Sequence, residues 1–150
     1  MRYNALLCLA ALSLAGCGDN VPAIETTTFA ASLGVNLAAM TKTPNGLYYQ
    51  DQIVGTGALA ENGKDVSVHY AGSLPDGQLF DVNIAPAAPL IFRIGVHGVI
   101  LGFEEGVTGM RVGGRRLILI PPSLGYGAQA TGNIPKNSIL VFRIDLVGVI

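Results

Sequence analysis

Apolar and polar side chains alternate along several short segments of the chain. In residues 65–70, the apolar side chains of Val66, Val68 and Tyr70 alternate with polar ones, a period of two that is typical of a strand with one buried face. Residues rich in β-branched side chains predict two longer strands, at 115–120 and 139–149. Turn sequences separate three further predicted strands, at 47–54, 78–82 and 90–94.

One stretch of the second half, residues 99–107, favours a helix over a strand. Its apolar residues, ending with Phe103, fall on one side, whereas Glu104 and Glu105 fall on the other. The helix is short, so packing has to stabilise it. Many short strands with a single helix do not form repeating βαβ units. The predicted fold class is therefore α+β, an antiparallel curved β-sheet wrapped around one short α-helix.

The amino end has the features of an export signal. After Arg2, an uncharged and mostly apolar run at 5–15 is too short to span a hydrocarbon layer of about 30 Å, but it fits the core of a secretory signal. The run ends in Leu14-Ala15-Gly16-Cys17, which resembles the bacterial lipoprotein signal, in which the cysteine is acylated.

That resemblance implies a lipoprotein signal peptide at 1–16 and lipidation of Cys17. It also implies an exported protein anchored by its lipid to a membrane of the bacterial cell envelope and facing the periplasm. An ordinary signal peptide cut nearby, with Cys17 incidental, is the alternative.

Residues 17–42 are interpreted as a tether that precedes the domain at 43–150. Positions 18–28 are small, polar and proline-containing. A short helix is one of two equal alternatives for the part that follows, where apolar residues recur at helical spacing: Phe29, Leu33, Leu37 and Met40. We expect this part to pack on the domain rather than to recognise a partner.

Composition and charge narrow the function. Nine Lys and Arg against ten Asp and Glu give a net charge of −1, which excludes the broad basic surface that nucleic acid binding requires. Two cysteines and two histidines cannot make a disulfide framework or a His-rich metal cluster. We interpret His69 and His97 as solvated, and Arg111, Arg115 and Arg116 as a solvated sheet face.

Five motifs follow one another in the predicted domain. They are Val68-His69-Tyr70-Ala71-Gly72, Asp76-Gly77-Gln78-Leu79-Phe80-Asp81, Gly102-Phe103-Glu104-Glu105-Gly106, Pro121-Pro122-Ser123-Leu124-Gly125-Tyr126-Gly127 and Ile139-Leu140-Val141-Phe142. In this order they resemble the FKBP family of peptidyl-prolyl isomerases over residues 45–150. The resemblance implies an enzyme that accelerates X–Pro bond rotation in exported proteins and needs no cofactor or metal. The alternative is a non-catalytic module or chaperone that binds proline-containing segments on the same fold.

The resemblance also implies an apolar aromatic pocket that stabilises the twisted amide. Asp81 and Tyr126 are the expected catalytic residues. Tyr126 and the backbone amide of Ile100 would bind the carbonyls of the peptide, and Asp81 would orient the pocket through Tyr70. The expected substrate-binding residues are Tyr70, Phe80, Phe92, Val99, Ile100, Phe103, Ile134 and Phe142.

Three positions depart from the family pattern. Leu90 replaces a usual aromatic residue, Phe103 replaces a tryptophan, and Gly98 removes a polar side chain before the helix. These departures bear on the affinity for macrolide inhibitors more than on isomerase activity. The expected partners are proline-containing polypeptides, macrolides and, through the lipid, a membrane. We expect a monomer that does not bind nucleic acid.

Overall fold

The computed structural model describes residues 20–150, so the expected signal peptide at 1–16 and the expected lipidation site Cys17 lie outside the described residues. Short 3-10 helices form at Ile24–Thr26 (η1), Ala31–Leu33 (η2), Leu37–Ala39 (η3) and Pro122–Leu124 (η4), and one α-helix, α1, at Leu101–Val107. The strands are β1 Thr41–Lys42, β2 Tyr48–Ile53, β3 Asp65–Ser73, β4 Leu79–Asn83, β5 Leu90–Arg93, β6 Arg115–Ile120 and β7 Leu140–Val149.

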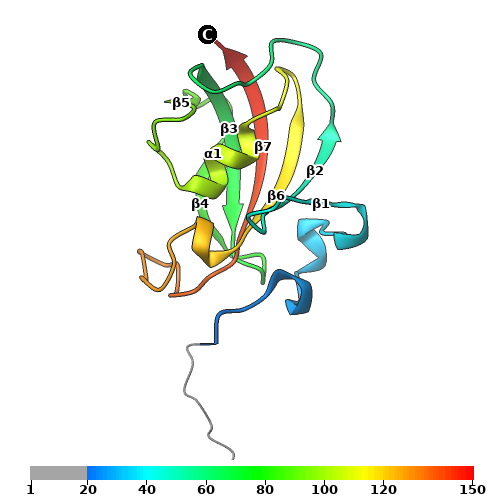
Figure 1. Ribbon diagram of the computed structural model, residues 1–150, viewed down its shortest axis with the longest axis vertical. Coiled ribbons are helices and arrows are strands. Elements are labelled where there is room, and N and C mark those ends of the chain that lie inside the picture. The colour runs from blue at the N-terminus through cyan, green and yellow to red at the C-terminus, as the bar shows by residue number, and fades with distance from the viewer. Residues whose placement is uncertain (1–19) are drawn as a thin grey trace, which may run out of the picture.

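The strands of the described region form one sheet in the order β1-β2-β6-β7-β3-β4, with β5 paired to β3 beside β4. Every pairing is antiparallel. The sheet is curved, and α1 lies against one of its faces, called the inner face below (Figure 1). The main apolar core, which includes Phe103, Ile118 and Phe142, fills the space between α1 and the inner face. The predicted α+β class, with a curved antiparallel sheet around one short helix, is confirmed.

The predicted strands are all present, with small shifts at their ends, and β1 is an addition. The helix begins at Leu101 rather than at Val99, because Ile100 has an extended backbone (φ −59°, ψ 144°). Within residues 20–150, no helix combines the length and apolar character that crossing a membrane requires.

The segment before β1 packs on the opposite, outer face of the sheet. Ile24 is 3% exposed and joins a second apolar cluster with Leu117, Leu119 and Val141. The part of the predicted tether at 17–42 that begins at Ile24 is therefore packed on the sheet, and the expected packing of Phe29, Leu33, Leu37 and Met40 on the domain is confirmed. The apolar spacing does not produce one continuous helix. Gly34 ends η2 in the left-handed conformation (φ +66°), and the chain forms separate 3-10 turns.

Arg116 contradicts the interpretation of the three arginines as a solvated face. Adjacent residues of a strand point to opposite faces, so Arg116 lies on the inner side and is 6% exposed. Its guanidinium donates to both carboxylate oxygens of Asp51 at 2.8 and 3.0 Å, and to the carbonyls of Gly106 and Thr108 at the end of α1. Arg115 lies on the outer face, where it pairs with Asp145.

Candidate active site

A pocket with a volume of about 140 Å³ opens where α1 meets the inner face of the sheet. Its lining comes from β3, β4, β5, β7, α1 and two loops: Tyr70, Asp81, Leu90, Val99, Ile100, Phe103, Tyr126 and Phe142. These residues are far apart along the chain. Only the closing of the sheet around α1 brings them together.

The base of the pocket is a set of aromatic rings in edge-to-face contact. The ring of Phe103 lies 5.4 Å from that of Tyr70 and 5.1 Å from that of Phe142, measured between centroids. The Tyr70 and Phe142 rings are 5.9 Å apart. Phe103 and Phe142 are buried, so their positions are fixed by the core. The result is a rigid, apolar recess that can receive a ring-shaped apolar group.

Gly72 makes room for this aromatic set. In the register, Gly72 lies between Asp81 of β4 and Phe142 of β7. A Cβ atom added at Gly72 would lie 2.6 Å from Phe142 Cε1 and 2.9 Å from two ring atoms of Phe80. Since real Cβ contacts are longer than this, the two rings can meet over β3 only if position 72 is a glycine.

The Tyr70 hydroxyl and the Asp81 carboxylate provide polar atoms at the pocket wall. The hydroxyl donates a hydrogen bond of 2.8 Å to Asp81 Oδ2. Desolvation raises the pKa of Tyr70 to about 12, and the hydrogen bond and negative charge of Asp81 contribute in the same direction. Tyr70 therefore stays protonated at neutral pH and continues to donate to Asp81. This confirms the expected contact between the two residues.

Tyr126 reaches the pocket from the loop after η4. Gly127 has a left-handed backbone (φ +60°), its N–H donates to the Pro122 carbonyl at 2.9 Å, and its carbonyl accepts from Asn137 N at 2.7 Å. These bonds tie both ends of the loop together. The Tyr126 side chain is 37% exposed, so its ring lines the pocket while it remains open to solvent.

Glu104 is a residue whose role the sequence analysis missed. The helical pattern placed it on the side away from Phe103, but it is 7% exposed. Its carboxylate accepts the backbone N–H groups of Gly95 (2.7 Å) and His97 (3.1 Å). Glu104 thus fixes the loop that carries Val99 and Ile100 into the pocket.

The expected site residues fall into two groups. Those that line the pocket as expected are Tyr70, Asp81, Val99, Ile100, Phe103, Tyr126 and Phe142. Phe80, Phe92 and Ile134 do not line it. Phe80 packs on Phe142 and Phe92 packs on Phe103, so these two rings support the wall from behind, whereas Ile134 is buried in the main core. Leu90 lines the pocket although it was not among the expected binding residues. The sequence did point to this position, because Leu90 stands where the family usually has an aromatic residue.

The two histidines also differ in their surroundings. His97 is 67% exposed at its side chain, in agreement with its interpretation as solvated. His69 is half-buried on β3, and its Nδ1 shares a hydrogen bond of 2.9 Å with Asn83 Oδ1. The solvated interpretation is therefore wrong for His69. Its partner on β4 became visible only once the two strands were paired.

Comparison with known protein families decides the assignment. Residues 57–147 match the model of the family described as FKBP-type peptidyl-prolyl cis-trans isomerase. The chain belongs to this family. The match covers every residue that lines the pocket.

Individual relatives and solved structures agree with this assignment. The chain is 46% identical over 102 residues to FK506-binding protein 3 of Candida albicans, covering 68% of this chain and 24% of that protein. It is 37% identical over 142 residues to the chloroplastic peptidyl-prolyl cis-trans isomerase FKBP13 of Arabidopsis thaliana, covering 87% of this chain and 64% of that protein.

Among solved structures, FkpA from Escherichia coli matches with a TM-score of 0.68 and 38% identity, over 74% of this chain and 51% of that one. AtFKBP13 matches with a TM-score of 0.68 and 37% identity, over 73% of this chain and 97% of that one. Against the first curated relatives, such as the Candida protein, this chain spans about a quarter of their length.

Proposed function

We propose that this chain catalyses cis-trans isomerisation of X–Pro bonds in exported polypeptides, using the pocket around Phe103. The observation that carries the proposal is the convergence of Tyr70, Asp81, Phe103, Tyr126 and Phe142 on one recess open to solvent, within the part of the chain that matches the isomerase family. The recess is small and apolar, as a site for a pyrrolidine ring should be.

The mechanism follows from the nature of the barrier. Rotation about the peptide bond is opposed by about 18–20 kcal/mol because amide resonance is lost at the twisted midpoint. The planar amide is the more dipolar form, so water stabilises it more than the twisted form. A pocket walled by the Tyr70, Phe103 and Phe142 rings replaces that water with apolar surface and thereby favours the twisted form. Lowering the barrier by roughly 4–6 kcal/mol gives an acceleration on the order of 10³–10⁴-fold.

Two donors would hold the substrate carbonyls during rotation. The Tyr126 hydroxyl belongs to a ring at the pocket wall. The backbone N–H of Ile100 donates to no residue within the described part of the chain, while the Ile100 carbonyl accepts the first bonds of α1. Asp81 would act through its hydrogen bond with Tyr70 and supply negative charge near the twisted carbonyl. No proton transfer and no covalent bond is needed.

A protease-free assay tests the proposal, with isomerisation of a proline peptide followed by NMR exchange. We expect acceleration by the native chain, and a loss of roughly tenfold or more in kcat/KM for Asp81→Asn and for Tyr126→Phe. Asp145→Asn is the matched control, because Asp145 is a carboxylate on the outer face. Binding of the peptide without acceleration would identify a non-catalytic module, and neither binding nor acceleration would contradict both functions.

We further propose that Cys17 is lipidated and anchors the protein in a cell-envelope membrane, facing the periplasm. The proposal is supported by Leu14-Ala15-Gly16-Cys17. Packed structure begins at Ile24, seven residues after Cys17, so this stretch would hold the domain within about 25 Å of the anchor. Mass spectrometry of the mature amino terminus tests this. We expect a diacylated or triacylated Cys17, and release of Cys17→Ser from the membrane fraction. An unmodified terminus elsewhere would refute lipidation.

Macrolide inhibitors are proposed as ligands of the same pocket. The supporting observation is that Leu90 and Phe103, two of the three positions that depart from the family pattern, both line it. Leu90→Phe and Phe103→Trp should each tighten binding of FK506 in a titration, while isomerase activity changes less.

We propose also that the protein is a monomer, which sedimentation equilibrium would test.

A further inference from the structure

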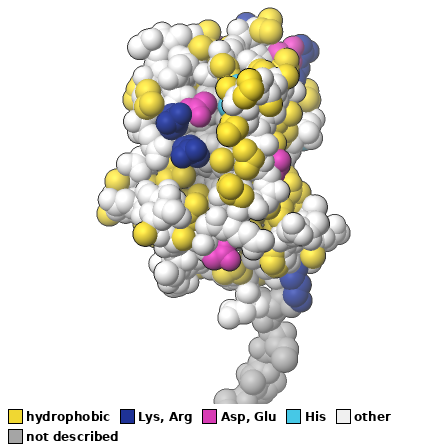
Figure 2. All heavy atoms as spheres, turned by 180° about the vertical axis from the view of Figure 1, so that it is seen from behind, with side chains coloured by type: hydrophobic (Ala, Val, Ile, Leu, Met, Phe, Trp, Pro, Cys, Tyr) yellow, Lys and Arg dark blue, Asp and Glu magenta, His cyan; other side chains and the backbone are white. Residues whose placement is uncertain are grey.

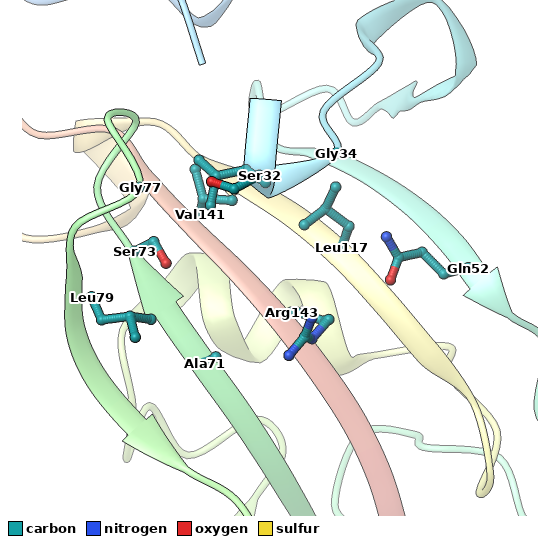
Figure 3. Close-up of a pocket in the computed structure, with 11 residues that line it drawn as sticks. Ser32, Gly34, Gln52, Ala71, Ser73, Gly77, Leu79, Leu117, Val141 and Arg143 are labelled. Atoms are coloured by element: carbon teal, nitrogen blue, oxygen red, sulfur yellow. The ribbon is translucent and has the colours of Figure 1, made fainter. Parts of the chain in front are cut away.

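A second and larger hollow lies on the outer face of the sheet, away from the isomerase pocket. Its volume is about 370 Å³. It is bordered by Ser32 of η2 on one side and Leu79 of β4 on the other, and strands β3, β6 and β7 form its floor (Figure 3). Basic side chains lie beside a band of hydrophobic ones on this face of the molecule (Figure 2). This hollow, called the outer groove below, has no role in the proposed isomerase reaction.

Arg143 is the charged residue of the outer groove, and its guanidinium has no counterion there. It is exposed on β7. Asp145, two residues along the same strand, pairs with Arg115, and Asp51 of β2 pairs with Arg116. Within residues 20–150, no acidic side chain forms an ion pair with Arg143. The groove therefore offers an unneutralised positive charge.

Ser73 adds a hydroxyl to the lining of the same groove. The residue is 5% exposed, and its side chain forms no hydrogen bond with any residue in the described range. The Ser32 hydroxyl and the Gln52 amide are also without such bonds. Figure 3 shows Ser73, Arg143 and Gln52 arranged around one hollow below Ser32. Ser32 and Gln52 are exposed at the rim, so these three polar side chains are free to bind a polar ligand that enters the groove.

We propose that the outer groove binds an extended polypeptide segment in which an Asp or Glu stands next to an aliphatic residue. A guanidinium can give two parallel hydrogen bonds to a carboxylate, and the Ser73 hydroxyl is a further donor. Leu79, which is 58% exposed, supplies apolar surface for the neighbouring side chain, and the buried Leu117 (2% exposed) lies in the floor.

A polypeptide, rather than a small acid, is indicated by the size of the groove. With a volume of about 370 Å³, it extends across the outer face from Ser32 of η2 to Leu79 of β4, so it offers room for several residues of an extended chain. The proposal does not depend on the isomerase function, because the groove and the pocket share no residue.

The test uses the full chain, labelled with ¹⁵N, and a capped peptide Ala-Leu-Asp-Leu-Ala that lacks proline. We expect chemical-shift changes at the amides of Ser73, Leu79 and Arg143. Replacing Asp by Asn in the peptide should weaken binding by about tenfold or more, as should Arg143→Gln. Ser73→Ala should also weaken it. Arg111→Gln, which removes an exposed arginine elsewhere, should bind like the native chain.

Arg143→Gln should keep native isomerase kinetics, because Arg143 is not in the pocket. Three results would each overturn the proposal. One is equal affinity for the Asp and Asn peptides, and another is undiminished binding by a folded Arg143→Gln variant. The third is a set of shift changes centred on Phe103 and Tyr126, which would show that the peptide occupies the isomerase pocket instead.

Discussion

Tyr70 and Asp81 are joined across strands β3 and β4 by a hydrogen bond of 2.8 Å from the phenol to the carboxylate. The bond links the aromatic base of the pocket to the edge strand of the sheet. The orientation of Asp81 is therefore coupled to that of the ring that contacts Phe103. Both residues line the pocket, so the bond is also the polar part of its wall.

The raised pKa of Tyr70 predicts a loss of stability in alkali. The folded-state pKa of about 12 lies above the unfolded value of about 10, so the folded chain keeps a proton that the unfolded chain loses. The stabilisation of the folded state by this proton is complete below about pH 10 and disappears as the pH rises through about 12. Asp81→Asn should remove only part of the rise in the pKa of Tyr70, because desolvation is the largest cause of that rise. Tyrosinate absorbance, with Tyr70→Phe to assign the signal, measures both values; a Tyr70 that titrates near 10 in the native chain would contradict this.

Gly72→Ala should disturb the aromatic base of the pocket. The added methyl group would meet Phe142 and Phe80 at 2.6 and 2.9 Å, so the rings must shift. We expect a loss of about 1–3 kcal/mol in the free energy of unfolding and a fall in isomerase activity. Gly98→Ala is the control, since no atom lies within 4 Å of its Cβ position. Urea denaturation compares the two, and equal stability of both variants would show that the rings yield without cost.

Glu104→Gln should loosen the loop before α1. The carboxylate accepts two backbone N–H groups, of Gly95 and His97, and a neutral amide is a weaker acceptor. We expect a loss of about 1–3 kcal/mol in stability and a rise in KM, because the loop carries Val99 and Ile100. Glu105→Gln, which affects only an exposed hydrogen bond from Asn45, should lower the stability less. Hydrogen exchange at Gly95 and His97 reports the loop directly, and unchanged protection would rule out this role.

Neighbouring arginines should differ sharply in their effect on stability. Arg116→Met removes a side chain that is 8% exposed, together with its bonds to Asp51 (33% exposed) and to the carbonyls of Gly106 and Thr108, so we expect a loss of about 1–3 kcal/mol in the free energy of unfolding. Arg115→Met removes one that is 41% exposed and should cost less than about 1 kcal/mol. Thermal unfolding of the two variants gives the comparison. Similar melting temperatures would mean that the buried Arg116 pair stabilises the fold no more than the exposed Arg115 pair does.

Some of the site could be predicted from the sequence because its residues lie in recognisable local patterns. The alternation at 65–70 placed Tyr70 on a strand, and the ordered motifs identified Asp81, Phe103, Tyr126 and Phe142 as one set. All five line the pocket. Phe80, Phe92 and Ile134 were expected there on the same basis, but they lie behind the wall. Sequence patterns indicate burial, and they do not distinguish a lining residue from the one that supports it.

Long-range partners account for the errors at Glu104, Arg116 and Ile24. A charged residue on a helix or strand is expected to face water unless a specific partner compensates its burial. For Glu104 and Arg116 that partner is backbone brought close by the tertiary fold. Ile24 lies in a short stretch with no regular apolar spacing, and its buried neighbours Leu117 and Leu119 come from a strand far along the chain.

The periodicity of side chains alone determined the class of fold, since an amphipathic strand or helix has to bury one face whatever its neighbours are. Tertiary structure alone decided which of the buried faces enclose a usable hollow and which polar groups find partners. Those outcomes depend on strand register, on the approach of rings over Gly72, and on the N-terminal segment, which borders the outer groove at Ser32 and leaves Arg143 exposed. Contacts of this kind join residues that no local pattern connects.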